Sequence, residues 1–171
     1  MNFRGTLIGV LTCSLGAMFA FSEKAPAATL EISITNNQAA GGLYLTPLFF
    51  ALHDGSFDPF NEGSAAPTAV ENLAEEGDPS GLQAAAGGFA NGVIASPGGF
   101  GGAPVIDPGE TATARVSVDP STGRYFSFMS MVIPSNDNFI GNDNPLAYQI
   151  FDAAGQFSKI APISVLGGSV W

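Results

Sequence analysis

The sequence is poor in cysteine, in basic residues and in charge of either sign. Its 171 residues include one Cys, one His, one Trp and five Lys or Arg, and only 12% are charged. One cysteine cannot form an internal disulfide, so a packed core or a bound ligand must stabilise the fold. Fifteen acids stand against the five bases, and the resulting net charge of −10 repels nucleic acid and anionic membranes.

Glycine, proline and apolar residues are abundant instead. The chain has 22 Gly and 12 Pro, and 46% of its residues are hydrophobic. This composition is neither that of a disordered chain nor that of a helical bundle rich in Glu and Lys. The length fits a single domain, and the many turn-forming residues indicate a loop-rich β protein.

The first 27 residues have the pattern of a secretory signal peptide. A basic start at Arg4 precedes an apolar run over residues 6–21 and the small residues Ala25-Pro26-Ala27. The run is short for a membrane span, and its continuation past Cys13 argues against a lipid-modified cysteine. We therefore predict a signal peptide over residues 1–27.

Removal of this segment leaves a mature domain over residues 28–171, which we expect to be secreted, periplasmic or held at the cell surface, with no stable membrane span. It has no cysteine, and three bases against fourteen acids give it a net charge of −11. Such a surface favours divalent cations or basic partners over nucleic acid.

Two segments near the start of the mature chain have the pattern of β-strands. Residues 29–35 alternate between apolar and polar side chains, which predicts a strand with one buried face. Residues 43–52 are almost entirely apolar but contain Pro47, which cannot donate to a β-ladder. We expect two short strands there, with the break at a sheet edge or bulge.

More strands follow in the second half of the chain. Residues 111–118 alternate again, and the turn over 119–123 predicts an antiparallel hairpin with the apolar run at 124–133. Further strands are expected at 146–151 and 160–165.

One helix is predicted between these two groups of strands. Thr68 and Glu71 have capping-box spacing, and Gly77 stands where a helix would end in left-handed geometry. Ser80 and Gln83 repeat the spacing and predict a second short helix. Short strands, few helices and many turns together predict an all-β fold, an antiparallel β-sandwich with one or two short helices in a long inter-strand connection.

The run at 124–133 is the best candidate for a central strand, because it is apolar, aromatic and β-branched until Pro134 stops it. The loop that follows concentrates oxygen-bearing side chains, namely Asp137, Asp143 and the amides of Asn136, Asn138, Asn142 and Asn144. Carboxylate and amide oxygens are the ligands that calcium prefers. Asx turns that simply terminate strands explain the same residues equally well.

Candidate catalytic groups are few. His53 beside Asp54, with Ser56 or Ser64 as nucleophile, has the residue types of a catalytic triad, but their spacing does not place them together. We expect His53 to be a hydrogen-bonded structural residue. Glu75, Glu76 and Asp78 crowd the end of the predicted helix, and their plain interpretation is a solvated acidic edge.

The sequence resembles the spondin amino-terminal (F-spondin) domain family of extracellular matrix proteins and their bacterial secreted relatives. The matching stretches follow the family's order along nearly the whole mature chain: Ile34-Thr35-Asn36, Leu45-Thr46-Pro47 with His53-Asp54, residues 69–78, and residues 129–141. The resemblance implies a β-sandwich similar in topology to C2 domains, a ligand-binding or adhesive role, and no enzymatic activity.

The resemblance also implies a calcium site. Its acids come from a Pro-Ser-x-Asp loop, which Asp137 matches, and from a later Trp-Asp-Ala-Gly-Thr segment followed by an acid. That second segment would begin at Trp171, so the remaining ligands are expected beyond it and the chain is expected to be incomplete at its C-terminus.

We therefore expect an exported, non-enzymatic binding or adhesion module for an extracellular protein or glycan, with Asp137 in a calcium-binding loop. One alternative is a secreted hydrolase of carbohydrates that uses paired carboxylates among Asp54, Glu75 and Asp137. Another is a structural protein of the cell surface or matrix.

Overall fold

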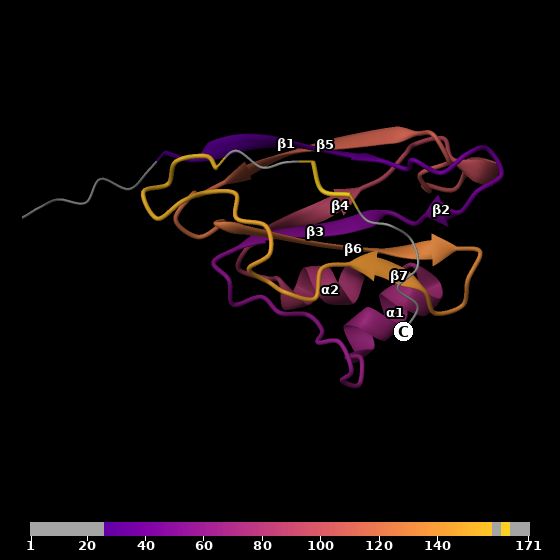
Figure 1. Ribbon diagram of the computed structural model, residues 1–171, viewed down its shortest axis with the longest axis horizontal. Helices are drawn as coiled ribbons and strands as arrows, with labels where there is room; N and C mark the ends of the chain where they lie inside the picture. The colour runs from indigo at the N-terminus through magenta and orange to yellow at the C-terminus, as the bar shows by residue number, and fades with distance from the viewer. Residues whose placement is uncertain (1–25, 159–161, 165–171) are drawn as a thin grey trace, which may run out of the picture.

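The computed structural model describes residues 26–158 and 162–164, where two β-sheets and two short helices form three layers (Figure 1). Most of the predicted signal peptide, part of the strand predicted at 160–165, and Trp171 lie outside these residues. The antiparallel sheets confirm the predicted all-β sandwich.

The central layer is a five-stranded antiparallel sheet. Its order is β2 (Tyr44–Leu45), β6 (Tyr125–Ile133), β3 (Leu48–His53) and β4 (Ala90–Ile94), and β7 (Phe139–Gly141) also pairs with β6. β6 is buried from Phe126 to Met131, which confirms it as the central strand. Pro47 separates β2 from β3, as its missing N–H predicts.

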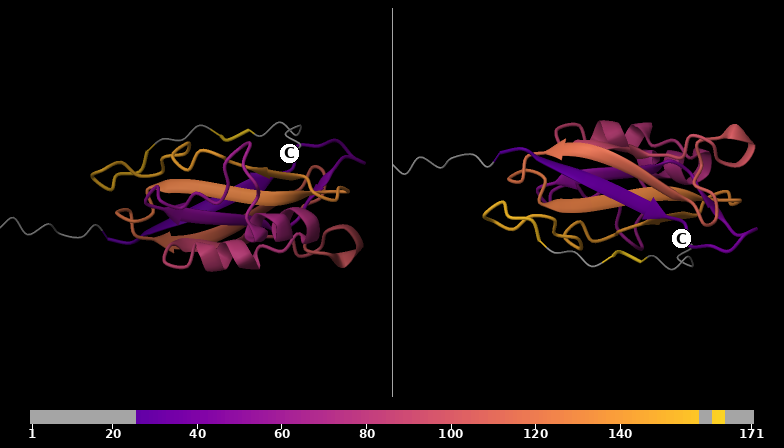
Figure 2. Two further views of the ribbon diagram at one scale, coloured as in Figure 1. Left: turned by 90° about the horizontal axis from the view of Figure 1, so that it is seen from below. Right: turned by 90° about the horizontal axis from the view of Figure 1, so that it is seen from above.

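A two-stranded sheet covers one face of this layer, and the helices cover the other (Figures 1 and 2). β1 (Ala28–Thr35) pairs with β5 (Thr111–Val118), while α1 (Thr68–Glu76) and α2 (Ser80–Ala85) lie in the connection between β3 and β4. A short 3₁₀ turn, η1 (Phe100–Gly102), precedes β5.

The alternation of side chains along β3 divides the core in two. Leu48, Phe50 and Leu52 pack toward β1 and β5, together with Phe126 and Phe128 of β6. Side chains of the opposite parity pack toward the helices: Phe49, Ala51 and Met129 meet Val70, Leu73, Leu82 and Ala86. Both faces of β3 are therefore buried, because each face has its own covering layer.

The predicted hairpin between β5 and β6 is wrong. The two strands are consecutive but lie in different sheets, since β5 pairs with β1 while β6 pairs with β2, β3 and β7. Their burial explains the difference: β5 keeps one solvated face and matches the alternation of β1, whereas β6 is buried on both faces. Residues 119–124 therefore connect one layer to the next, with Gly123 pressed against the Val118 side chain.

Two local predictions also need correction. α1 and α2 have Pro67 and Pro79 at their N-caps and no side-chain cap hydrogen bond, so Thr68 and Ser80 begin the helices rather than cap them. The left-handed end of α1 is confirmed, with Gly77 at φ 67°. The segment 146–151 forms isolated bridges, such as Tyr125 with Gln149, rather than the predicted strand.

Candidate functional site

Asp137 lies in the turn between β6 and β7. The Ser135 hydroxyl donates to the Val132 carbonyl and accepts from the Asn138 amide at 3.2 Å. The Val132 amide donates to the Asn138 carbonyl at 2.8 Å. These bonds close the turn and leave Asp137 exposed at its tip.

The β6–β7 turn forms one wall of a pocket of about 250 Å³, which we call the α1 pocket. A second wall is the face of α1 that carries Val70, Glu71, Ala74 and Glu75. The third is the β3–α1 loop (residues 54–66), which contributes residues 60–64 and Ala66. Where this loop meets β7, the rings of Phe60 and Phe139 pack nearly perpendicular, with centroids 5.2 Å apart.

Four exposed carboxylates line the α1 pocket: Glu62, Glu71, Glu75 and Asp137. Glu71 and Glu75 share one face of α1, because residues four apart in a helix are neighbours. Glu75 and Asp137, which are far apart in the sequence, thus line the same pocket. Asp54 is not part of its lining. The carboxylates, the aromatic pair, Asn61 and Ser64 give the pocket an acidic but partly apolar character.

The residues that the structure describes do not make a complete calcium cage. Among them, no three His, Cys, Asp or Glu side chains are placed to hold a metal ion together. Asn144 accepts the Leu146 amide at 2.9 Å, which is the Asx turn of the alternative interpretation. Asp137 as a calcium ligand therefore stays a prediction, and its expected partners beyond Trp171 lie outside the described residues.

His53 is buried and hydrogen-bonded through both ring nitrogens, which confirms its predicted structural role. Its Nδ1 accepts the Gly55 amide at 3.1 Å, and its Nε2 lies 3.0 Å from Ser127 Oγ. Because Nδ1 accepts, the ring proton is on Nε2 and is donated to the Ser127 hydroxyl. The ring packs against Phe57, Phe89 and Tyr125.

Asn142 extends this contact into a buried polar chain, which we call the His53–Ser127–Asn142 chain. Its amide nitrogen donates to Ser127 Oγ at 3.1 Å, and its amide oxygen accepts the Phe128 amide at 2.9 Å. Asn142 follows directly after β7, where the pairing with β6 ends, and its side chain accepts the Phe128 amide of β6 in place of a strand partner. Sequence reasoning missed Ser127, although a serine inside a strand buried on both faces is a signal that a polar partner exists.

The charges and hydrogen bonds around His53 do not suit a catalytic triad. Burial lowers the pKa of His53, while the neighbouring Asp54 carboxylate partly opposes the shift. The Ser56 hydroxyl donates to Asp54 at 2.6 Å, and the Ser56 backbone amide donates to the same carboxylate. Both hydrogen bonds lower the pKa of Asp54. Ser56 is therefore paired with the acid rather than with His53, and Ser127, which does contact His53, is only 1% exposed. Neither serine is an accessible nucleophile activated by the histidine.

A hydrogen bond to the residue that follows the polar chain holds one wall of the α1 pocket. Asp143, the residue after Asn142, accepts the Glu62 amide at 2.8 Å through its carboxylate. The β3–α1 loop is thus attached near its start, by Gly55 on His53, and again at the pocket, by Glu62 on Asp143. In the described part of the chain, no helix is both long and apolar enough to cross a membrane.

Comparisons with known proteins agree with this architecture. A family model described as Spondin_N, for the spondin N-terminal domain, matches residues 37–145, which run from just after β1 to just after Asn144. A comparison with curated protein sequences finds no match. The matched stretch is more than half of the chain and contains β2 to β7, both helices and the α1 pocket. The chain therefore belongs to the spondin N-terminal domain family.

Proposed function

We propose that this chain is an exported, non-enzymatic binding and adhesion module that takes its ligand in the α1 pocket. The family match over residues 37–145 carries the proposal, because spondin N-terminal domains are extracellular modules of a binding or adhesion type without catalysis. The signal-peptide pattern over residues 1–27 supports export.

The lining of the α1 pocket limits the chemistry of its ligand. Four carboxylates favour a positively charged group, while Asn61 and Ser64 offer hydrogen bonds to hydroxyls. The Phe60–Phe139 pair provides an apolar surface beside them. An extracellular protein with a basic side chain or a glycan fits this combination, and an anionic ligand does not.

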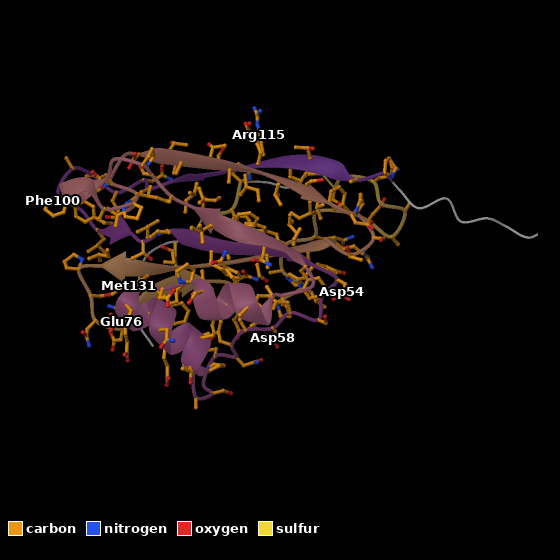
Figure 3. All side chains as sticks on the ribbon, turned by 180° about the vertical axis from the view of Figure 1, so that it is seen from behind. Asp54, Asp58, Glu76, Phe100, Arg115 and Met131 are labelled. Carbon is orange, nitrogen blue, oxygen red and sulfur yellow. The ribbon has the colours of Figure 1, made fainter. Side chains whose placement is uncertain are left out.

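A binding comparison on the complete gene product tests the pocket. Glu71→Gln together with Glu75→Gln removes two charges from the pocket wall, and Glu76→Gln removes one from the same helix outside the lining (Figure 3). Arrays of extracellular glycans and matrix proteins should retain the wild type and Glu76→Gln, and lose the double variant. Equal retention of all three would place the binding surface elsewhere.

Calcium is the second part of the proposal, with Asp137 as one ligand. The support is its place at the exposed tip of the β6–β7 turn, at the position that the family resemblance assigns to an acid. A cation there would lower the repulsion among the pocket carboxylates and stabilise the folded state by mass action.

Calorimetry of the complete gene product in calcium and in a chelator tests this part. At calcium concentrations about 100 times the Kd, the gain in unfolding free energy is about 2.7 kcal/mol. Asp137→Asn should abolish the gain, and Glu76→Gln should keep it. Equal melting temperatures of the wild type with calcium and with chelator would remove the metal from the proposal.

Carbohydrate hydrolysis is the competing activity, since Glu75 and Asp137 line one pocket. Glycoside hydrolases place two carboxylates on either side of the scissile bond. Turnover of any member of a polysaccharide panel, lost in both Glu75→Gln and Asp137→Asn, would replace the binding module with an enzyme. We expect no turnover.

A further inference from the structure

Two hydrogen bonds attach the β3–α1 loop to the sheet, one to the buried His53 and one to the exposed Asp143. Near its start, the Gly55 amide donates to His53 Nδ1 at 3.1 Å. Nine residues from His53, at the pocket, the Glu62 amide donates to Asp143 at 2.8 Å, and Asp143 directly follows Asn142 of the His53–Ser127–Asn142 chain. These two bonds, with the buried Phe57 between them, hold this wall of the α1 pocket in place.

The hydrogen bond between Gly55 and His53 exists only while the imidazole is neutral. Nε2 already donates to Ser127, so an added proton must occupy Nδ1. The Nδ1–H and the Gly55 N–H would then be two donors directed at each other, and they would repel. Gly55 has a φ of 107°, which residues with a side chain rarely adopt, and it has no side chain of its own to hold it in this position.

Nothing around His53 compensates fully for a buried positive charge. The ring is 0% exposed and has aromatic neighbours on three segments, Phe57, Phe89 and Tyr125. β4 and α2 have no titratable side chains. The charged or titratable groups on the other neighbouring segments are Asp54, Asp58 and Glu62 in the loop, Arg124 just before β6, Tyr125 at its start, and Asp143 after β7.

We propose that protonation of His53 detaches the start of the β3–α1 loop from the sheet and loosens that wall of the α1 pocket, so that the module releases its ligand in acid. The loop movement follows from the His53 contacts alone, and only the release of a ligand rests on the proposed function. The change is confined to this part of the molecule, because one proton on His53 removes one hydrogen-bond acceptor, Nδ1, and only the loop contact at Gly55 depends on that acceptor.

The direction of the pH effect follows from the neutral folded state. Burial lowers the pKa of His53 below its ordinary value of 6.5, so the unfolded chain takes up the proton first as the pH falls. The stabilisation from the neutral ring is complete above pH 6.5 and is lost as the pH falls through the lowered pKa. Asp54 limits the shift, since its negative charge favours the protonated ring.

Amide hydrogen exchange of ¹⁵N-labelled complete gene product, without any ligand, tests the loop movement between pH 7.5 and 4.5. The protection factor of Gly55, corrected for intrinsic exchange, should stay constant above about pH 6.5, fall by up to about tenfold for each pH unit between pH 6.5 and the lowered pKa of His53, and level off below that pKa. Glu62 should follow with a smaller loss, whereas the amides of β1 and β5 should not change.

Two variants separate this mechanism from general acid unfolding. Asp54→Asn removes the neighbouring charge, so the titration of His53, followed by its ring ¹⁵N shifts, and the pH at which the loss of Gly55 protection levels off should move to lower values together. His53→Asn provides an acceptor that does not titrate, and it should remove the pH dependence of Gly55.

Three results would overturn the proposal: a His53 that does not titrate in this range, one that titrates while Gly55 stays protected, or a titration midpoint and a levelling-off pH that Asp54→Asn moves apart. The wild type and Asp54→Asn suffice if His53→Asn does not fold. A failed search for ligands would contradict the proposed function and leave these exchange results valid.

Discussion

The two faces of the central sheet differ in what their buried residues do. Where β3 and β6 pair, the face toward β1 and β5 presents only Phe50, Leu52, Phe126 and Phe128. The face toward the helices includes His53 and Ser127 among its apolar residues, and the α1 pocket lies on this side.

The apolar face contributes chiefly to the stability of the fold, and the face with polar residues chiefly holds loops in place. An apolar face gains free energy roughly in proportion to the area that it buries. A buried polar pair contributes less on balance, because each group must first lose its water, but its bonds fix directions. The helix-covered face therefore stabilises less for its area and instead holds the loops that build the pocket.

The largest effect is expected on the apolar face. Phe50→Ala should lower the free energy of unfolding by about 3–5 kcal/mol, because it leaves a cavity between the two sheets. Denaturant unfolding of the purified protein measures the loss. Phe100→Ala is the matched control, since that ring is 69% exposed and its removal should cost about 0.5 kcal/mol or less. Comparable losses in the two variants would contradict the assignment of the core.

A smaller loss is expected on the polar face. Asn142→Ala should cost about 1–3 kcal/mol, because it leaves the Phe128 amide without its acceptor and takes away one of the two donors to the Ser127 hydroxyl. Asn136→Ala, at an exposed position of the β6–β7 turn, serves as the control and should be nearly neutral. If Asn142 and Ser127 act as one unit, their double variant should cost less than the two single losses added together.

The smallest effect is expected on the outer surface of the β1–β5 layer, where Arg115 projects away from the core (Figure 3). Its guanidinium pairs with Glu31 at 2.9 Å, and the two side chains are 76% and 54% exposed. Arg115→Ala should cost about 0–1 kcal/mol, since water and salt screen such a pair. The same unfolding measurement checks it, and a loss as large as that of Asn142→Ala would contradict the expected order.

The features of the fold that the sequence predicted are the local ones. The alternation of β1, the break at Pro47 and the end of α1 at Gly77 each depend on the chemistry of a few neighbouring residues. The partner of β5 is not local. A turn over residues 119–123 is compatible with a hairpin and with a crossing between layers, and only the packing of the whole domain decides between them.

The candidate site divides in the same way. The exposed turn that carries Asp137 was predictable from the sequence. Pro134 ends the buried strand, and the Asn and Asp residues that follow it are polar and belong at the surface. The union of Glu71 and Glu75 with Asp137 was not, since it depends on how α1 packs over β6. The contact of His53 with Ser127 joins residues 74 positions apart and leaves no spacing pattern.

The pairing of β1 with β5 has a consequence for the order of folding. Glu31 and Arg115, opposite each other in this pair, are 84 positions apart, so the first strand to be made waits for most of the domain before it gains a partner. Closing so long a loop is entropically costly, and contacts of this kind slow the folding reaction. β1 of a newly synthesised chain therefore has no strand to pair with until β5 has been made.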